Sequence, residues 1–329
     1  MKKIINNPDD FVNESINGLV NSYSDIYNFA SETEKVLTRA KKAQNKVGLV
    51  SGGGSGHLPL FAGYVGKGLL DSCAIGNVFA SPSVDEISIA IKNADSGKGV
   101  ICIYGNYGGD VMNFDMANEM IELEGIKSES IVVADDVASA TVNEKEKRRG
   151  VAGMIYVFKI AGSIAETGAD FDEVKRIAIK TNENIKTMGI ALTPCILPQA
   201  GKPTFEIGDD EMEIGMGIHG EPGIRRGKLK SANEITDELF EKLISDGNFS
   251  KGDKVSILVN SLGATPHEEL FIVTNRLKNN FDSKNIDIAK SYVGRYATSM
   301  EMSGLSITIL KLDEELEKHL LSPAENPFW

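Results

Sequence analysis

Short apolar runs alternate along the chain with longer stretches in which apolar residues recur at a helical period. The short runs predict strands at 47–50, 100–104, 131–134, 189–193, 255–260 and 306–310. A two-residue alternation of apolar and polar positions over 211–218 predicts one more, half-buried strand. Strands that alternate with helices are typical of an α/β fold with largely buried sheets.

Capping patterns mark where helices are expected to begin. Ser83 with Glu86, and Ser231 with Glu234, form Ser-x-x-Glu capping boxes, and a similar pattern opens an amphipathic stretch at 170–187. Thr265 followed by a proline predicts an N-cap with proline at the first helical position. The mostly apolar run at 150–167 predicts a buried helix.

A length of 329 residues suits two domains, at roughly 150 residues for each. Because a new strand is predicted near residue 189, we place the boundary just before it. Residues 1–185 are then an N-terminal α/β domain with glycine-rich loops, and 186–329 are a C-terminal α/β domain.

Charge and composition exclude several classes of protein. The 35 Lys and Arg residues against 47 Asp and Glu give a net charge of −12, which argues against direct binding of nucleic acid. No apolar run approaches the roughly 18 residues of a membrane span, and the N-terminus lacks the apolar segment of a signal peptide. Three scattered cysteines argue against a disulfide framework. We therefore expect a cytoplasmic protein that does not bind membranes.

Three clusters among the 33 glycines lie in loops that follow predicted strands. The first cluster, at 52–57, contains four glycines and ends at His57, but it matches neither a P-loop nor a GxGxxG motif. Glycines in such a loop expose backbone N–H groups and allow a ligand to approach closely. The cluster is therefore interpreted as a ligand loop rather than a simple turn, although not as a nucleotide site.

Two further clusters contain candidate chemical groups. Asp110 follows the strand at 100–104 and could act as a general base or could cap the next helix. His219 lies among the glycines of 215–223. His57 and His219 thus both occupy glycine-rich loops at strand ends, where α/β folds place their ligands.

Other assignments are weaker. The two remaining histidines, His267 and His319, are both predicted to lie on the surface. Zinc could bind to His57, Asp110 and His219, but their spacing does not indicate a metal site, and none is expected. A serine hydrolase is disfavoured because no GxSxG motif precedes suitable Asp and His residues.

Five motifs together resemble the substrate-binding subunit of dihydroxyacetone kinase, the DhaK-like family. They are SGGGSGH at 51–57, GNYGGDVMNF at 105–114, RRGVAG at 148–153, GIHGEPG at 217–223 and LGATP at 262–266. The resemblance extends from residue 2 to about 312. It implies two α/β domains with mixed sheets flanked by helices, and a homodimer.

The resemblance also implies roles for individual residues. His219 would bond covalently to the ketone carbon of dihydroxyacetone or a similar short ketose, forming a hemiaminal. His57 would hydrogen-bond the substrate, Asp110 would take the proton from the hydroxyl that is phosphorylated, and Gly53 and Gly54 would line the pocket. No cofactor is expected on this chain, because the family carries ADP or ATP on a separate helical subunit or domain.

Four positions depart from the usual kinase pattern: Leu58 replaces a Glu, Ala80 a Thr, Gly105 a Lys, and Gly108 a Thr or Ser. Because precise positioning carries much of phosphoryl transfer, these losses weigh more on catalysis than on binding. We therefore expect a ketose sensor of the DhaQ type, which would act as coactivator of an operon's transcription factor. The alternative is the substrate-binding subunit of a phosphotransferase-linked kinase for dihydroxyacetone or erythrulose.

Overall fold

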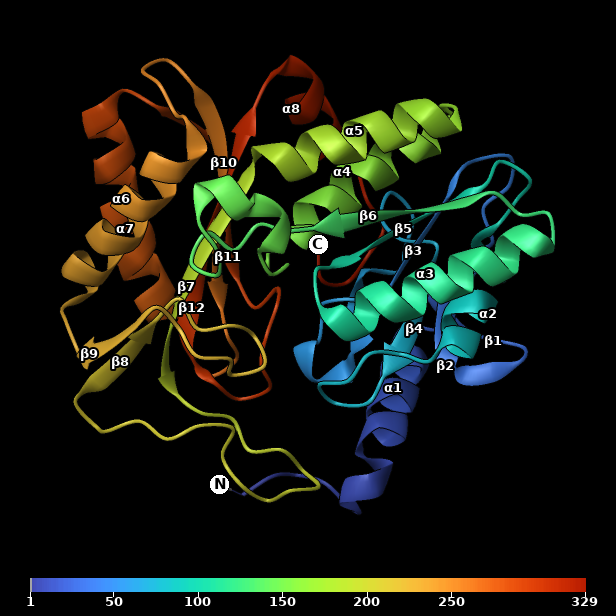
Figure 1. Cartoon of the computed structure of the whole chain (residues 1–329), viewed down its shortest axis with the longest axis horizontal. Helices are drawn as coiled ribbons and strands as arrows, with labels where there is room; N and C mark the ends of the chain where they lie inside the picture. Colours follow the sequence, from blue (N-terminus) through green and yellow to red (C-terminus); the bar gives the residue numbers. More distant parts are fainter. Residues whose placement is uncertain (1) are drawn as a thin grey trace.

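Two six-stranded sheets stand side by side in the computed structural model, which describes residues 2–329 (Figure 1). The first sheet has the strand order β1-β2-β4-β3-β5-β6. Strands β4, β3, β5 and β6 run parallel to one another. Strand β2 pairs antiparallel with β4, and β1 pairs antiparallel with β2 at the edge of the sheet. The strands are β1 Tyr27–Ala30, β2 Thr33–Arg39, β3 Gly48–Gly54, β4 Ser72–Gly76, β5 Val100–Gly105 and β6 Ser128–Val133.

The second sheet has the order β11-β10-β12-β7-β8-β9 and is antiparallel except for the β10–β11 pair. Both sheets are therefore mixed and flanked by helices, as the sequence predicts. The strands are β7 Ile185–Thr193, β8 Glu211–Ile214, β9 Arg225–Lys228, β10 Lys254–Ser261, β11 Asp287–Gly294 and β12 Ser303–Leu312.

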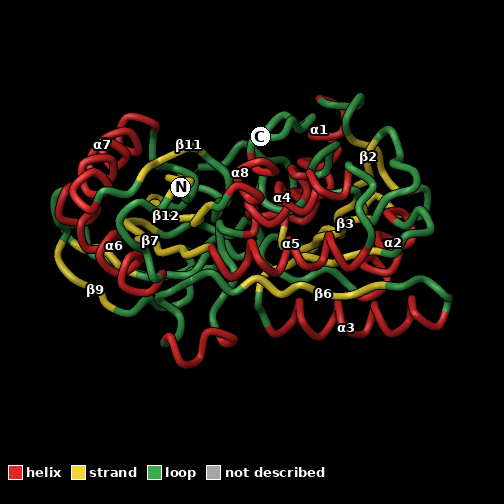
Figure 2. The backbone as a smooth tube through the Cα atoms, turned by 90° about the horizontal axis from the view of Figure 1, so that it is seen from above, coloured by secondary structure: helices red, strands yellow, loops and turns green. Residues whose placement is uncertain are grey.

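Helices cover the sheets on both sides. Helices α2 and α3 pack on the first sheet and α6 and α7 on the second, while α4 and α5 lie between the two sheets (Figures 1 and 2). Every residue of α4 from Met154 to its penultimate position is buried, as expected for a helix with sheets on either side. The helices are α1 Phe11–Ser22, α2 Val84–Ala94, α3 Gly108–Leu123, α4 Met154–Glu166, α5 Phe171–Asn184, α6 Ala232–Gly247, α7 His267–Lys284 and α8 Glu314–Leu320, with short 3₁₀ turns at Pro8–Asp10, Ser55–His57, Ala62–Tyr64 and Val142–Lys147.

Most of the predicted elements are confirmed. All six strands predicted from apolar runs are present, and both capping boxes form, at Ser83 with Glu86 and at Ser231 with Glu234. The buried helix predicted at 150–167 is α4.

Three predictions are wrong. The strand predicted over 211–218 ends at Ile214, because Gly215 adopts a positive φ of 77° and turns the chain. Thr265 does not cap α7, since its hydroxyl donates to the carbonyl of Gly304 in the neighbouring strand. His319 is buried rather than exposed, and its Nδ1 lies 3.0 Å from the Ser163 hydroxyl.

The two halves of the chain are joined by backbone contacts beside the glycine-rich loop. The N–H of Met300 donates to the carbonyl of Gly56 at 2.9 Å, and the Thr298 hydroxyl donates to the carbonyl of Leu58 at 2.9 Å. The largest core cluster also contains residues from both halves. The domain boundary between residues 185 and 186 stays a prediction, and it coincides with the first residue of β7.

None of the helices among residues 2–329 combines the length and the apolar character that crossing a membrane requires.

Candidate functional site

Three loops from two sheets meet at one cavity. The chain leaves β3 through Gly54 into the 3₁₀ turn at Ser55–His57, and it leaves the parallel neighbour β5 through Tyr107 into α3. Because carboxyl ends of parallel strands lie at the same edge, these two loops are neighbours. The third loop, 215–223, follows β8 of the second sheet and brings His219 against them.

The cavity has a volume of about 190 Å³, which is the size of a small metabolite rather than a nucleotide. Its wall combines aromatic rings with the polar side chains of Ser81, Asp110 and His219. The residues that line it are Gly54, Phe61, Phe79, Ala80, Ser81, Tyr107, Asp110, Ile218 and His219.

His57 is fully buried at the back of this site. Its Nδ1 lies 2.7 Å from the carbonyl oxygen of Thr298, and because a carbonyl only accepts, Nδ1 carries the proton. Burial, followed by the proximity of His219, lowers the pKa of His57 to about 3, so that its ring is neutral. Nε2 is therefore an acceptor, and no group within residues 2–329 donates to it.

His219 stands over His57 in an edge-to-face arrangement, with ring centroids 4.7 Å apart. The ring of Tyr107 lies at the same distance from His219 on another side. The Nδ1 of His219 lies 2.7 Å from Oε1 of Glu221. Burial alone would raise the pKa of Glu221, but the hydrogen bonds from the ring and the backbone of His219 outweigh it and lower that pKa to about 2, so the carboxylate is ionised.

Asp110 is the third residue of α3 and is not the N-cap, a position that Tyr107 occupies. Its side chain is buried, and its Oδ1 has no hydrogen-bond partner among the described residues. Burial raises the pKa of Asp110 to about 6, and Ser81 and His219 offset this only in part. Such a carboxyl ionises just below neutral pH, which suits a general base.

The two predicted glycines have different places. Gly54 lines the cavity, and a Cβ on it would lie 2.5 Å from the carbonyl oxygen of Val78, so the close approach of these loops requires glycine. Gly53 lies behind Phe61, whose ring would be 2.2 Å from a Cβ at this position. Asp110, His219 and Gly54 thus line the cavity. His57 lies behind the wall, stacked on Phe79 and edge-on to His219, and Gly53 lies behind Phe61.

The four positions that depart from the usual kinase pattern also lie in different parts of the structure. Ala80 lines the cavity, whereas Leu58 contributes its backbone carbonyl to the contact with the second half of the chain. Gly105 lies beside Tyr107, whose ring would be 3.1 Å from a Cβ there, and Gly108 has open space around it.

Sequence reasoning missed several groups of the site. Phe61, Phe79 and Tyr107 form its aromatic wall, and no periodicity in the sequence marks them as neighbours. Glu221 was within reach, because it lies two residues after His219 in the GIHGEPG motif, where a carboxylate can contact a histidine across a turn.

Comparison with known proteins identifies the class to which this fold and site belong. The Dak1 domain family matches residues 17–328, and the chain belongs to that family.

Among curated relatives, the dihydroxyacetone-binding subunit DhaK of PTS-dependent dihydroxyacetone kinase 1 from Listeria innocua is 46% identical over the whole of both chains. The corresponding DhaK subunit of Lactococcus lactis is 47% identical over 95% of this chain and 94% of its own. Among solved structures, the dihydroxyacetone kinase operon co-activator DhaQ has a TM-score of 0.89 at 33% identity, covering 94% of this chain and 96% of its own. The DhaK-like resemblance predicted from the five motifs is confirmed.

Proposed function

We propose that this chain is the dihydroxyacetone-binding subunit of a two-component kinase, working with a separate helical subunit that carries the nucleotide. The observation that carries the proposal is the set of buried polar atoms without partners around the cavity: Nε2 of His57, Oδ1 of Asp110 and the Tyr107 hydroxyl. Two of these are acceptors that hydroxyl groups of a small hydroxyketone would satisfy, and leaving them unpaired is costly. The names of the nearly full-length relatives support the same substrate.

In this proposal His219 attacks the ketone carbon and holds the ketose as a hemiaminal. His57 accepts a hydrogen bond from a substrate hydroxyl through Nε2. Asp110 takes the proton from the hydroxyl that receives the phosphoryl group, because its raised pKa leaves it ionised but basic near neutral pH. The phosphoryl donor is expected on the partner subunit, either as ATP or as bound ADP that is rephosphorylated there.

The sensor predicted from the four departing positions becomes the second candidate. The specific observation in its favour is the fold of the DhaQ co-activator, which matches this chain along nearly its whole length. Curated relatives at higher identity are kinase subunits, and we therefore place the kinase reading first. A homodimer, a transcription-factor partner and a four-carbon substrate remain proposals of the same kind.

The covalent step can be tested with dihydroxyacetone labelled with ¹³C at its ketone carbon. We expect the wild-type protein to convert the carbonyl ¹³C signal into that of a tetrahedral carbon, and His219→Ala to abolish the conversion because the nucleophile is gone. His267→Ala, which removes an exposed histidine of α7, is the matched control. A tetrahedral signal that persists in His219→Ala would overturn the assignment.

A second measurement separates the two candidates. The protein is mixed with the helical nucleotide-binding subunit of a related two-component kinase, loaded with ATP, and ketose phosphate is followed by ³¹P NMR. Product formation supports the kinase subunit, whereas ketose binding without any product supports the sensor.

A further inference from the structure

Glu221 holds His219 at two points. Its Oε1 lies 2.7 Å from Nδ1 of the His219 ring, and its Oε2 accepts the backbone N–H of His219 at 3.0 Å. The turn between them contains Gly220 with a φ of 85°, a conformation that glycine adopts at no steric cost. One carboxylate therefore fixes both the backbone and the ring of the histidine.

The surroundings leave this carboxylate available to His219. A Cβ on Gly217 would lie 2.1 Å from Oε2 of Glu221, so any other residue there would displace this carboxylate from its present place. The nearby Arg149 is engaged elsewhere, because its guanidinium donates to Asp136 at 2.9 Å and to the carbonyl of Gly215 at 2.8 Å. The Arg149 guanidinium is thus held beside the loop by these partners and not by Glu221.

We propose that Glu221 is a positioning residue that fixes His219 as the Nδ1–H tautomer and so leaves the Nε2 lone pair free for a carbonyl carbon. A carboxylate only accepts hydrogen bonds, so the proton between the two groups belongs to Nδ1. The hydrogen bond at one ring nitrogen decides which nitrogen carries the proton. This inference rests on the proposed function, since it assigns the residue that prepares the nucleophile of the covalent step.

The covalent step forms one N–C bond and breaks the carbonyl π bond. The Nε2 lone pair forms the N–C bond, and the carbonyl π pair moves onto the oxygen, which takes one proton from water. The ring then carries a positive charge, which the Glu221 carboxylate stabilises at 2.7 Å. Nδ1 releases its proton through Glu221 to solvent, so that one proton is taken up and one is lost. The same arrangement of carboxylate, imidazole and reacting atom orients histidines in other enzymes.

The tautomer is tested without any ligand by ¹⁵N NMR of histidine-labelled protein, recorded well above the ordinary histidine pKa of about 6.5. In the wild type we expect a protonated Nδ1 and an unprotonated Nε2 at His219. Glu221→Gln and Glu221→Ala should move the proton to Nε2 in a large fraction of molecules. Glu206→Gln, which changes an exposed carboxylate in the same half of the chain, is the control and should leave the signals unchanged. A wild-type His219 protonated at Nε2, or signals unaffected in both Glu221 variants, would overturn the inference.

The rate of adduct formation with labelled dihydroxyacetone gives the chemical readout. Loss of the carboxylate should slow the formation of the tetrahedral carbon by at least roughly ten- to a hundred-fold, the range seen when a group that orients a metal-bound histidine is removed. Glu221→Asp, which keeps the charge, should recover part of the rate, whereas a purely structural role would not distinguish it from Glu221→Gln. If the wild type formed no adduct, the proposed function would fail while the tautomer result still stood, so the two failures are distinguishable.

Discussion

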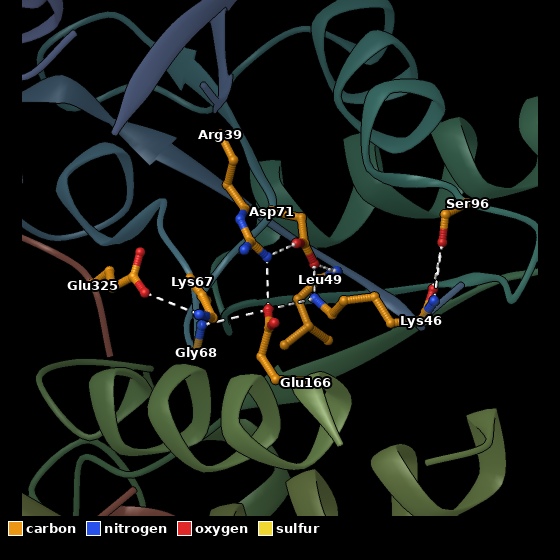
Figure 3. Close-up of polar contacts among 9 residues, drawn as sticks. All are labelled: Arg39, Lys46, Leu49, Lys67, Gly68, Asp71, Ser96, Glu166 and Glu325. Atoms are coloured by element: carbon orange, nitrogen blue, oxygen red, sulfur yellow. Dashed lines mark hydrogen bonds and ion pairs between the residues drawn. The ribbon is translucent and has the colours of Figure 1, made fainter. Parts of the chain in front are cut away.

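Two buried polar clusters of this protein are built in opposite ways. Beside β2 and β4, the charges of Arg39, Lys46, Asp71 and Glu166 pair with one another (Figure 3). Asp71 is bonded to Arg39 at 2.7 Å and to Lys46 at 2.5 Å, and it also accepts the N–H of Leu49 at 2.9 Å. At the cavity, by contrast, Oδ1 of Asp110 has no partner among residues 2–329, nor has Nε2 of His57 behind the cavity wall.

The difference separates a structural role from a functional one. A charge network whose members satisfy one another cannot accept a ligand without losing bonds, and breaking it exposes buried charge. Buried atoms that the fold leaves unpaired cost stability, and such a cost persists in a native protein where a ligand or a reaction uses it. Burial of polar groups alone therefore does not identify the site. Unpaired atoms do so only together with a cavity, because Ser51, Tyr104 and Ser128 also carry unpaired buried hydroxyls but do not line this one.

The largest effect is expected at the unpaired cluster. Asp110→Asn keeps the shape of the side chain but removes the base, and ketose phosphorylation with a nucleotide-loaded partner subunit should fall by about 10²- to 10⁴-fold. The ¹³C signal of the tetrahedral adduct should persist, because His219 is unchanged. Loss of the adduct together with turnover would show that Asp110 binds the ketose rather than moving its proton.

The paired cluster should respond in stability. Asp71→Ala leaves Glu166 as the one carboxylate paired with the buried Arg39 and Lys46 among the four charges, and we expect the free energy of unfolding to fall by about 3–5 kcal/mol in urea melts. Lys278→Ala, which breaks an exposed pair with Asp282, is the matched control and should cost at most about 0.5 kcal/mol. Equal losses in the two variants would contradict the distinction between buried and exposed pairs.

The pH dependence of stability gives the smallest and sharpest comparison. The pKa of Asp110 rises from 3.8 to about 6 on folding, so its favourable contribution is present at low pH and is lost as the pH rises through 6. The pKa of His57 falls from 6.5 to about 3, so its contribution is present above pH 6.5 and is lost as the pH falls towards 3. The two dependences oppose each other between about pH 4 and 6 in the wild type.

Asp110→Asn removes one of them. We compare the free energy of unfolding of the variant with that of the wild type in urea melts at pH 4 and pH 7. The difference, variant minus wild type, should be more positive at pH 7 than at pH 4 by about 1–3 kcal/mol. Asp115→Asn, an exposed position of the same helix, is the control and should show no such difference. A pH-independent effect of Asp110→Asn would mean that the carboxyl is not perturbed by burial.

The sequence predicts much of this fold because several signals are local. Capping boxes at Ser83 and Ser231 and the apolar runs of β5 and β10 each identify an element from a few neighbouring residues. Strands β1, β2, β4, β9 and β11 were missed, because their formation depends on pairing with strands outside each segment.

For the site, the glycine clusters and the five motifs led to His57, Asp110 and His219, which the fold brings to one cavity. What the sequence could not provide is contact between distant segments. The carbonyl of Thr298 that fixes the His57 tautomer lies 241 positions away, and no pattern marks it. His319 shows the same limit, since a position near the C-terminus predicts exposure, whereas α8 packs onto α4 and buries it.

The contact of residues 298–300 with the loop at 56–58 ties formation of the cavity to the folding of both halves of the chain. The first sheet supplies His57 and Asp110, and the second supplies His219. A chain in which only one sheet has formed would lack either His219 or the pair His57 and Asp110, so the cavity could not assemble. If the proposed covalent step is right, adduct formation with a ketose would therefore report that both halves are folded and docked.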